Sequence, residues 1–412
     1  MEITPQDGPI VIDPAGRDIH GEAARMRARG PAAKVELPGG VEAWAVNDSS
    51  LLKLLLTDSR VSKDPRRHWP TWINGEISPE SPLFVWLVVN NMLTSYGEDH
   101  RRLRRLISSA FTTRRTAAMR PRIEKIVTEL LDGFEAAEPG LPVDLREEYA
   151  YPLPIAVICE LFGIDDEAAQ DEMRRCVSAF FNTDAEPGEA TAAYSRMQEL
   201  LGALIAEKRK NPGDDLSSAL IAARDDDSRL SEEELIGTLL LFIGAGHETT
   251  VNLLDNAIYA LLTRPDQLAL VRAGRVGWDD VVEETLRAES PIANLPLRFA
   301  VEDITLDDGV TLRKGDAILA CYAAASRDPR VHGDDADRFD VTRADKEHIA
   351  FGYGVHHCLG APLARLEATI ALPALFDRYP DLTLAAEPGE LRPLASFISN
   401  GHRSLPVHLT AG

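Results

Sequence analysis

The sequence predicts a mainly α-helical protein with small antiparallel β-sheets, an α+β fold. Helical periodicity dominates from about 98 to 290, and strand-like alternation is confined to two regions, near 34–46 and 297–322. In addition, one apolar segment is long enough to form a central helix. No repeat, low-complexity tract or linker-like run divides the 412 residues, which are enough for two ordinary domains or one unusually large one.

Two local signals place the strands. Residues 34–37 and 41–46 flank a Pro-Gly-Gly sequence at 38–40, a pattern typical of a β-hairpin. In the second strand region, the Asp-Gly pair at 308–309 is a favoured two-residue hairpin turn. A further helix is expected over 361–378, and the tail after it has the pattern of short strands.

The longest predicted helix begins after Ser231, which forms a capping-box sequence with Glu234. Apolar residues continue to Leu261, and Pro265 lies just beyond the expected end. At 1.5 Å per residue this helix is about 50 Å long. Because it is apolar nearly all round, we expect it to be buried.

The middle of this helix, residues 244–250, contains two glycines, an acid and two hydroxyl side chains. A glycine here costs up to about 1 kcal/mol relative to alanine, and an unpaired buried carboxylate costs far more. Two interpretations follow. The segment is either a kink with a locally satisfied polar patch, or a bend that opens a groove beside a ligand.

Cys358 stands alone between glycines, just ahead of the apolar helix at 361–378. A helix N-terminus offers free N–H groups and a positive dipole end, and both stabilise a thiolate, the form of cysteine that binds metal. No second thiolate or paired histidine lies at the ligand spacing of a zinc site. The residues alone leave three interpretations: an iron ligand, a nucleophile with a histidine base, or a buried structural cysteine.

Composition excludes several classes of protein. The net charge of −22 disfavours non-specific binding to nucleic acid or an anionic membrane. No run of eighteen apolar residues occurs, and the N-terminus lacks a signal-peptide pattern. The four cysteines are widely spaced, so we expect reduced thiols and a cytoplasmic location.

Several motifs together resemble the cytochrome P450 superfamily of haem-thiolate monooxygenases, in particular its soluble bacterial, actinobacterial members. Residues 351–360 match the haem signature F-x-x-G-x-[HR]-x-C-x-G, and 245–249 match the oxygen-activation motif [AG]-G-x-[DE]-T. Residues 284–287 match E-x-x-R, with Arg338 at the place of the third member of that ion-pair cluster. The segment 97–104 is similar to the helix that binds the haem propionates.

The resemblance implies a single cytochrome P450 domain spanning 1–412, with a fold in which the long central helix crosses a haem b cofactor. It assigns the iron to the Cys358 thiolate, which pushes electron density toward O–O cleavage in this family. Glu248 and Thr249 are the implied catalytic pair, handling protons on the oxygen side. The implied cofactor contacts are His100, Arg104, Ala245, Gly246, Arg298, Phe351, His356, Cys358 and Gly360. Phe351, an aromatic residue, is equally compatible with plain core packing.

The implied activity is insertion of one oxygen atom from O2 into a hydrophobic substrate of steroid, macrolide or other polyketide type. Its pocket is expected to draw on 84–93, 177–183, 239–245, 293–297 and 397–398. Three polar side chains in or near these segments are candidates for orienting oxygenated groups: Asn90, Asn91 and Asn294.

Electrons must come from a partner, because the chain has no flavin or iron–sulfur motif. The resemblance implies a ferredoxin with an NAD(P)H-dependent ferredoxin reductase, and a monomeric enzyme. An arginine-rich segment is either an ordinary solvated helix face or a docking surface for an acidic ferredoxin. Its members are Arg101, Arg102, Arg104, Arg105, Arg114, Arg115, Arg120 and Arg122.

Two alternatives remain open. One is another oxidation on the same scaffold, such as oxidative coupling, desaturation or a peroxide-driven reaction. The other is a non-catalytic haem-binding sensor. Retention of Glu248 and Thr249 favours the monooxygenase, because a proton relay is superfluous in a sensor and peroxide users of this family tend to lose the pair.

Overall fold

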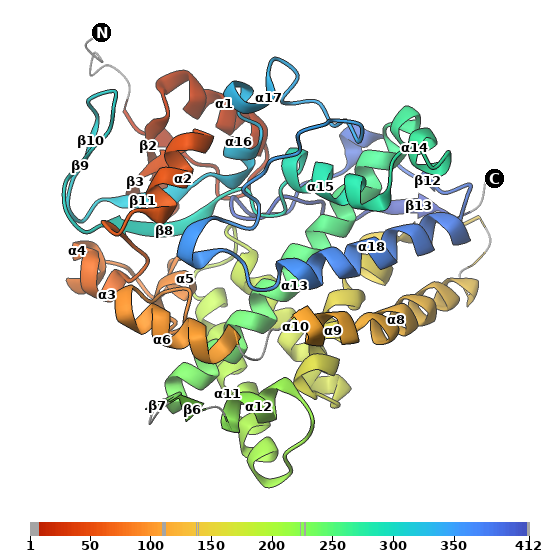
Figure 1. The fold of residues 1–412 in the computed structure, drawn as a ribbon, viewed down its shortest axis with the longest axis horizontal. Coiled ribbons are helices and arrows are strands. Elements are labelled where there is room, and N and C mark those ends of the chain that lie inside the picture. The colour runs from red at the N-terminus through yellow and green to blue at the C-terminus, as the bar shows by residue number, and fades with distance from the viewer. Residues whose placement is uncertain are drawn as a thin grey trace.

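The computed structural model describes residues 8–108, 113–136, 138, 140–222, 224–225 and 228–409. Helices dominate, and the main sheet lies to one side of them with the N-terminal helices α1 and α2 beside it (Figure 1). The predicted fold class is therefore confirmed. Within the described residues, no helix combines the length and apolar character needed to cross a bilayer.

The largest sheet has six strands in the order β1-β2-β3-β11-β8-β4. The predicted hairpin is present as β2 and β3, and Gly39 and Gly40 of its turn have φ angles of +86° and +75°. The sheet is mixed, which corrects the expectation of purely antiparallel sheets, because β1 pairs parallel with β2 and β11 pairs parallel with β3. The strands are β1 (Ile10–Val11), β2 (Ala32–Leu37), β3 (Val41–Val46), β4 (Val61–Ser62), β8 (Leu295–Ala300) and β11 (Ala317–Ala320).

Three smaller sheets are antiparallel. The predicted Asp-Gly hairpin is confirmed, since Gly309 has a φ of +87° and Thr305 pairs with Thr311 across the turn. The tail strand β13 pairs with both β12 and β5. The strands are β9 (Ile304–Thr305), β10 (Thr311–Leu312), β5 (Val143–Asp144), β12 (Thr383–Leu384), β13 (Pro406–His408), β6 (Arg224–Asp225) and β7 (Ser228–Arg229).

The remaining helices surround the predicted long one, α13 (Glu232–Leu262), and the helix predicted over 361–378 is α18 (Ala361–Arg378). The α-helices of the N-terminal half are α1 (Ile19–Arg29), α2 (Ser49–Thr57), α3 (Pro65–His68), α4 (Pro70–Ile73), α5 (Phe84–Val88), α6 (Gly97–Ser108), α7 (Thr113–Ala118), α8 (Arg120–Gly133), α9 (Pro152–Phe162) and α10 (Glu167–Phe181). Those that follow are α11 (Glu189–Lys210), α12 (Leu216–Ala222), α14 (Pro265–Arg272), α15 (Trp278–Ala288), α16 (Tyr322–Ser326) and α17 (Pro329–His332). Four short helices complete the set: η1 (Phe134–Ala136), the π-helix η2 (Arg146–Ala150), η3 (Gly354–His356) and η4 (Pro388–Glu390).

Helix α13 runs through the centre of the molecule (Figure 1). Its predicted capping box is present: the Glu234 N–H donates to Ser231 Oγ over 3.1 Å, and the Ser231 N–H donates to Glu234 Oε2 over 2.9 Å. The helix is continuous through its glycines. At Gly246 an added Cβ would lie 3.0 Å from Ile158 Cδ1, so glycine allows α9 to pack closely there.

The apolar core has two main parts that meet along α13. The N-terminal half of the helix, including Leu239 and Ile243, belongs to the cluster that packs on the main sheet. The C-terminal half, including Val251 and Leu254, belongs to the cluster formed with α8, α15 and α18. The polar segment 244–250 therefore lies at the boundary between two apolar cores.

Candidate functional site

Cys358 lies in the loop before α18 and is accessible to solvent. Cys358 is exposed, whereas Cys159, Cys176 and Cys321 are buried. The Cys358 N–H donates to the Phe351 carbonyl over 2.9 Å, which closes the loop. Gly354 has a φ of +70°, and an added Cβ would lie 2.6 Å from the Leu56 carbonyl oxygen, so this turn requires glycine.

The Cys358 sulfur faces the first residues of α18. Surrounding protein raises the pKa of the thiol, but the N–H groups of Gly360 and Ala361 hydrogen-bond to it and act to lower that pKa. The charges of Arg104 and Arg365 act in the same direction. These donors and charges would stabilise a thiolate bound to a metal. Phe351 packs beside them, its ring centroid 4.5 Å from the Arg365 guanidinium.

Four side chains implied by the resemblance gather next to this loop. His100 and Arg104 lie one turn apart on α6, and the His100 ring is 4.1 Å from the ring of His356, centroid to centroid. Arg104 Nη2 donates to the His357 carbonyl over 2.9 Å. Arg298, on β8, is close enough to His356 for its charge to lower the pKa of that histidine.

Lys63 is a fifth member of this cationic cluster, and sequence reasoning missed it. It follows β4, which pairs with β8 beside Arg298. It is buried, and its ammonium donates to the Pro296 carbonyl over 3.2 Å. Burial lowers the pKa of Lys63 well below its ordinary value, and the charge of Arg298 lowers it further. A single lysine between a serine and an aspartate carries no local signal that could have identified it.

The cationic cluster (Lys63, His100, Arg104, Arg298 and His356) lacks a counter-charge within the part of the chain that the structure describes. Among the described residues, no carboxylate forms an ion pair with any of the five, and three buried nitrogens have no hydrogen-bond partner: His100 Nε2, Arg104 Nη1 and Arg298 Nη1. Burial lowers the pKa of His100 to about 4. Buried donors without acceptors are costly, so the cluster fits an anionic ligand carrying several oxygens. The two propionates of a haem meet that requirement next to the Cys358 sulfur.

On α13, Thr249 and Ala245 face open space. Ala245 is exposed although it lies in the middle of a central helix, and Thr249 is half-buried. The Thr249 hydroxyl donates to the Ala245 carbonyl over 2.6 Å. Ala245 and Thr249 therefore border the space beside the helix, whereas Gly246 packs against Ile158 of α9.

Glu248 points away from that space into a buried ion pair. Arg146 Nη2, from the π-helix η2, lies 3.0 Å from Glu248 Oε1, and both side chains are buried. Desolvation raises the pKa of Glu248, although the charge of Arg146 acts to lower it. Sequence reasoning missed Arg146, which lies 102 positions earlier in the chain.

The E-x-x-R pair forms a completely buried ion pair. Arg287 donates to both Glu284 oxygens over 2.8 and 2.7 Å, and both side chains are 0% exposed. Arg287 also donates to the carbonyls of Ala336 and Arg338 over 2.7 Å each, and the Asp340 N–H donates to Glu284 over 2.7 Å.

The third arginine of this cluster is Arg343, which corrects the assignment of Arg338. Arg343 Nε lies 3.7 Å from Glu284 Oε1, and its side chain is 11% exposed. Arg338 offers only its backbone carbonyl to Arg287, and its side chain is exposed.

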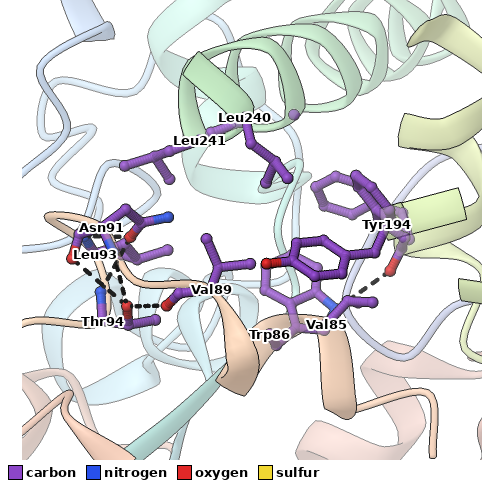
Figure 2. Close-up of a pocket in the computed structure, with 13 residues that line it drawn as sticks. Val85, Trp86, Val89, Asn91, Leu93, Thr94, Tyr194, Leu240 and Leu241 are labelled. Carbon is purple, nitrogen blue, oxygen red and sulfur yellow. Dashed lines mark hydrogen bonds between the residues drawn. The ribbon is translucent and has the colours of Figure 1, made fainter. Parts of the chain in front are cut away.

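An apolar pocket opens beside α13 (Figure 2). Its lining confirms three of the five expected segments, 84–93, 177–183 and 239–245; the segments 293–297 and 397–398 do not line it. Of the three expected asparagines, only Asn91 lines this pocket, while Asn294 donates to the Phe397 carbonyl inside the protein. The lining residues are Val85, Trp86, Val89, Asn91, Leu93, Thr94, Phe180, Phe181, Tyr194, Leu240, Leu241, Gly244 and Ala245.

The arginine-rich segment is partly neutralised by nearby acids. Arg101 pairs with Glu98, and Arg102 with Glu234. Arg122 lies 2.7 Å from Glu160. Residues 109–112 lie outside the described residues. These pairs reduce the positive field expected from the sequence.

Comparison with known proteins gives consistent matches. The family model described as "Cytochrome P450" matches residues 189–273 and 278–387. The 2-hydroxy-5-methyl-1-naphthoate 7-hydroxylase of Streptomyces carzinostaticus is 48% identical over 404 residues, covering 97% of each chain. The structure of CYP154A1 from Streptomyces coelicolor A3(2) superimposes with a TM-score of 0.92 at 56% identity, covering 97% of this chain and 100% of that one. Testosterone-bound CYP154C4 from Streptomyces sp. ATCC 11861 has a TM-score of 0.94 at 44% identity, covering 98% and 99%.

Proposed function

This chain belongs to the cytochrome P450 family and is a P450 monooxygenase, and on that premise we propose that it oxidises a flat, hydrophobic, polycyclic substrate at a haem b held by Cys358. The observation that carries the cofactor assignment is a largely buried cationic cluster beside an exposed thiol, a cluster that has no counter-charge among the residues described. The proposed redox partner is a ferredoxin with an NAD(P)H-dependent reductase, and the proposed state is a monomer.

The proposed cofactor contacts divide between two faces. On the thiolate face, Cys358 is the iron ligand, Gly360 supplies an N–H to its sulfur, and Phe351 shields the loop. The cationic cluster of Lys63, His100, Arg104, Arg298 and His356 binds the propionates. Bound there, haem supplies the redox chemistry that activates dioxygen.

On the opposite face, the proposed cofactor contact is Ala245, while Gly246, the other residue implied there, packs against α9. The Thr249 hydroxyl donates its own proton to the Ala245 carbonyl, and its oxygen can accept a hydrogen bond that holds a water near the reacting oxygen. Glu248, which forms an ion pair with Arg146, is the proposed proton donor to this side of the site, since its raised pKa favours uptake of a proton. The second proposed candidate, another oxidation at the same haem, uses the same residues and is separated from hydroxylation by the product formed.

The shape and chemistry of the pocket support a polycyclic substrate. Four aromatic side chains line it: Trp86, Phe180, Phe181 and Tyr194. Aromatic faces favour stacking with flat ring systems. Two of the similar proteins are described with fused-ring molecules, a naphthoate and testosterone, and this supports the same class here.

Tyr194 is proposed to fix the orientation of that substrate. Its hydroxyl points into the pocket (Figure 2), and it accepts a hydrogen bond from Gln198 over 3.0 Å, which leaves its own proton available. Desolvation raises the pKa of Tyr194, so the hydroxyl stays protonated. By contrast, Trp86 donates to the Phe180 carbonyl, and the Thr94 hydroxyl donates to the Val89 carbonyl.

The first prediction follows from this donor. Testosterone is expected to shift the haem spin state on binding, and Tyr194→Phe is expected to weaken that binding about threefold to tenfold, the value of one hydrogen bond. Binding of androstane, the same ring skeleton without oxygen, is expected to change little. The measurement is a spectral titration of both proteins with both ligands, alongside a hydroxynaphthoate and a macrolide lactone. A macrolide alone shifting the spin state would contradict the polycyclic class.

The second prediction concerns the partner. Reduction of the haem by an acidic ferredoxin is expected to slow as salt is added, because cationic residues of α6 to α8 attract it across solvent. The slope is expected to be shallow, since several of these arginines already pair with acids. Stopped-flow reduction at several salt concentrations measures this, and a rate independent of salt would remove the docking surface from the proposal.

A further inference from the structure

A buried row of polar side chains continues from the oxygen side of the site toward the C-terminal tail. Glu248, Asn252 and Asp255 lie at positions i, i+4 and i+7 of α13, on one face of the helix. Their exposed fractions are 3%, 0% and 0%. This row runs away from the pocket, so the polar segment of α13 is only one end of a longer network.

The Arg146 guanidinium lies close to all three side chains of this row. Its Nη2 lies 3.0 Å from Glu248 Oε1, and its Nη1 donates to Asn252 Oδ1 over 2.9 Å. The same Nη1 lies 3.6 Å from Asp255 Oδ2. One guanidinium is therefore shared unequally between two buried carboxylates, with the closer contact to Glu248.

His402 closes the network from the tail. Its Nδ1 lies 3.0 Å from Asp255 Oδ2, and its backbone N–H donates to the same oxygen over 2.8 Å. Its side chain is 16% exposed, which makes it the member in contact with solvent. At the preceding residue, Gly401, an added Cβ would lie 2.6 Å from Asn252 Oδ1, so only glycine lets the tail approach this closely.

When Glu248 and Asp255 are both ionised, the charges of these groups balance only if His402 carries a proton. Arg146 contributes one positive charge against the two negative charges of Glu248 and Asp255, and an imidazolium restores neutrality. A net charge enclosed in a protein interior is strongly unfavourable. Asp255 also has a buried oxygen, Oδ1, without a hydrogen-bond partner, so it can accept more from Arg146 than it now does.

We propose that His402 is a positioning residue which, through Asp255, controls how firmly Arg146 holds Glu248. With His402 protonated, Asp255 is neutralised from the tail side and Arg146 stays on Glu248. With His402 neutral, Asp255 competes for Arg146, and Glu248 is released to exchange protons with water. This role of His402 rests on the proposed function of Glu248 in handling protons, and it places a control of Glu248 outside the pocket.

The groups that face His402 set the direction of its titration. Desolvation lowers the pKa of His402, and the charge of Arg146 also lowers it. The hydrogen bond and charge of Asp255 raise the pKa, as does the charge of Glu289. The two carboxylates outweigh the other effects, so the pKa of His402 is raised. The Tyr259 ring lies 4.4 Å away between centroids and adds no charge. His402 is therefore protonated at low pH and becomes neutral as pH rises through a value above 6.5.

The third prediction has two readouts on the haem-loaded protein. In a histidine NMR titration, assigned with His402→Gln, the pKa of His402 is expected above 6.5 and is expected to fall in Asp255→Asn. In NADPH oxidation without added substrate, driven by a plant-type ferredoxin and its reductase, the fraction of electrons released as peroxide is expected to change roughly twofold to tenfold between about pH 6 and about pH 9. His402→Gln is expected to lose this change and keep the high-pH value throughout.

His408→Gln is the matched control, because His408 lies on the same tail in β13 outside the network, and it is expected to keep the wild-type profile. An ordinary or lowered pKa for His402, or an unaltered pH profile in His402→Gln, would overturn the proposal. A protein that binds no haem would instead contradict the proposed function, and the NMR titration would still decide whether His402 and Asp255 are coupled.

Discussion

Replacing Glu284 by alanine is expected to leave little or no haem-loaded protein. The substitution strands the Arg287 guanidinium, which is 0% exposed and would keep only its two carbonyl acceptors. Breaking a buried ion pair in this way costs about 3–5 kcal/mol, a large part of the roughly 5–15 kcal/mol that holds a typical protein folded. The Asp340 N–H also loses its acceptor. The measurements are haem absorbance per protein chain and the thermal unfolding midpoint.

Two variants make this result specific. Glu284→Gln keeps an oxygen for Arg287 and the Asp340 N–H, so it is expected to give an intermediate yield of holoenzyme. Asp279→Ala, at an exposed position on the same helix α15, is expected to load haem normally. Normal holoenzyme from Glu284→Ala would mean that the ion pair does not hold the core under the cofactor loop.

Local sequence signals predicted much of the fold because they depend on residues close together in the chain. The capping box at Ser231, the hairpin at 38–40 and the helix over 361–378 each follow from a few neighbouring residues and are all present. The parallel pairing of β3 with β11 brings together strands more than 270 positions apart. No local pattern encodes that pairing, so the sequence could not predict that the main sheet is mixed and not antiparallel.

The same limit separates the site residues that sequence could identify from those it could not. The resemblance to cytochrome P450 correctly indicated that His100, Arg104 and His356 gather beside Cys358. It could not indicate Lys63, whose place depends on the pairing of β4 with β8. The resemblance also placed the third arginine of the Glu284–Arg287 cluster at 338. The choice between Arg338 and Arg343 depends on the direction in which each side chain leaves its loop, which the sequence does not encode.

Replacing Thr249 by alanine is expected to uncouple NADPH oxidation from product formation. Glu248 is engaged by Arg146, so the hydroxyl of Thr249 is the polar side chain of this motif that borders the open side of α13. Without it, protons reach the reduced oxygen with less control, and peroxide leaves before oxygen is transferred. Product per NADPH is expected to fall about tenfold or more, which is less than the roughly hundredfold or greater contribution of a typical proton-transfer group. The readouts are peroxide, NADPH and product, measured with whichever panel compound is turned over.

Two further substitutions of Thr249 separate the effect of its hydroxyl from the effect of its shape. Thr249→Ser keeps a hydroxyl that can bond to the Ala245 carbonyl and is expected to restore most of the coupling. Thr249→Val keeps the shape of the side chain without the hydroxyl and is expected to behave like alanine. If valine restored coupling and serine did not, the residue would act by filling space beside Ala245. If all three variants stayed coupled, proton delivery would have to run through Glu248 without Thr249, and release of Glu248 from Arg146 would become the controlling step.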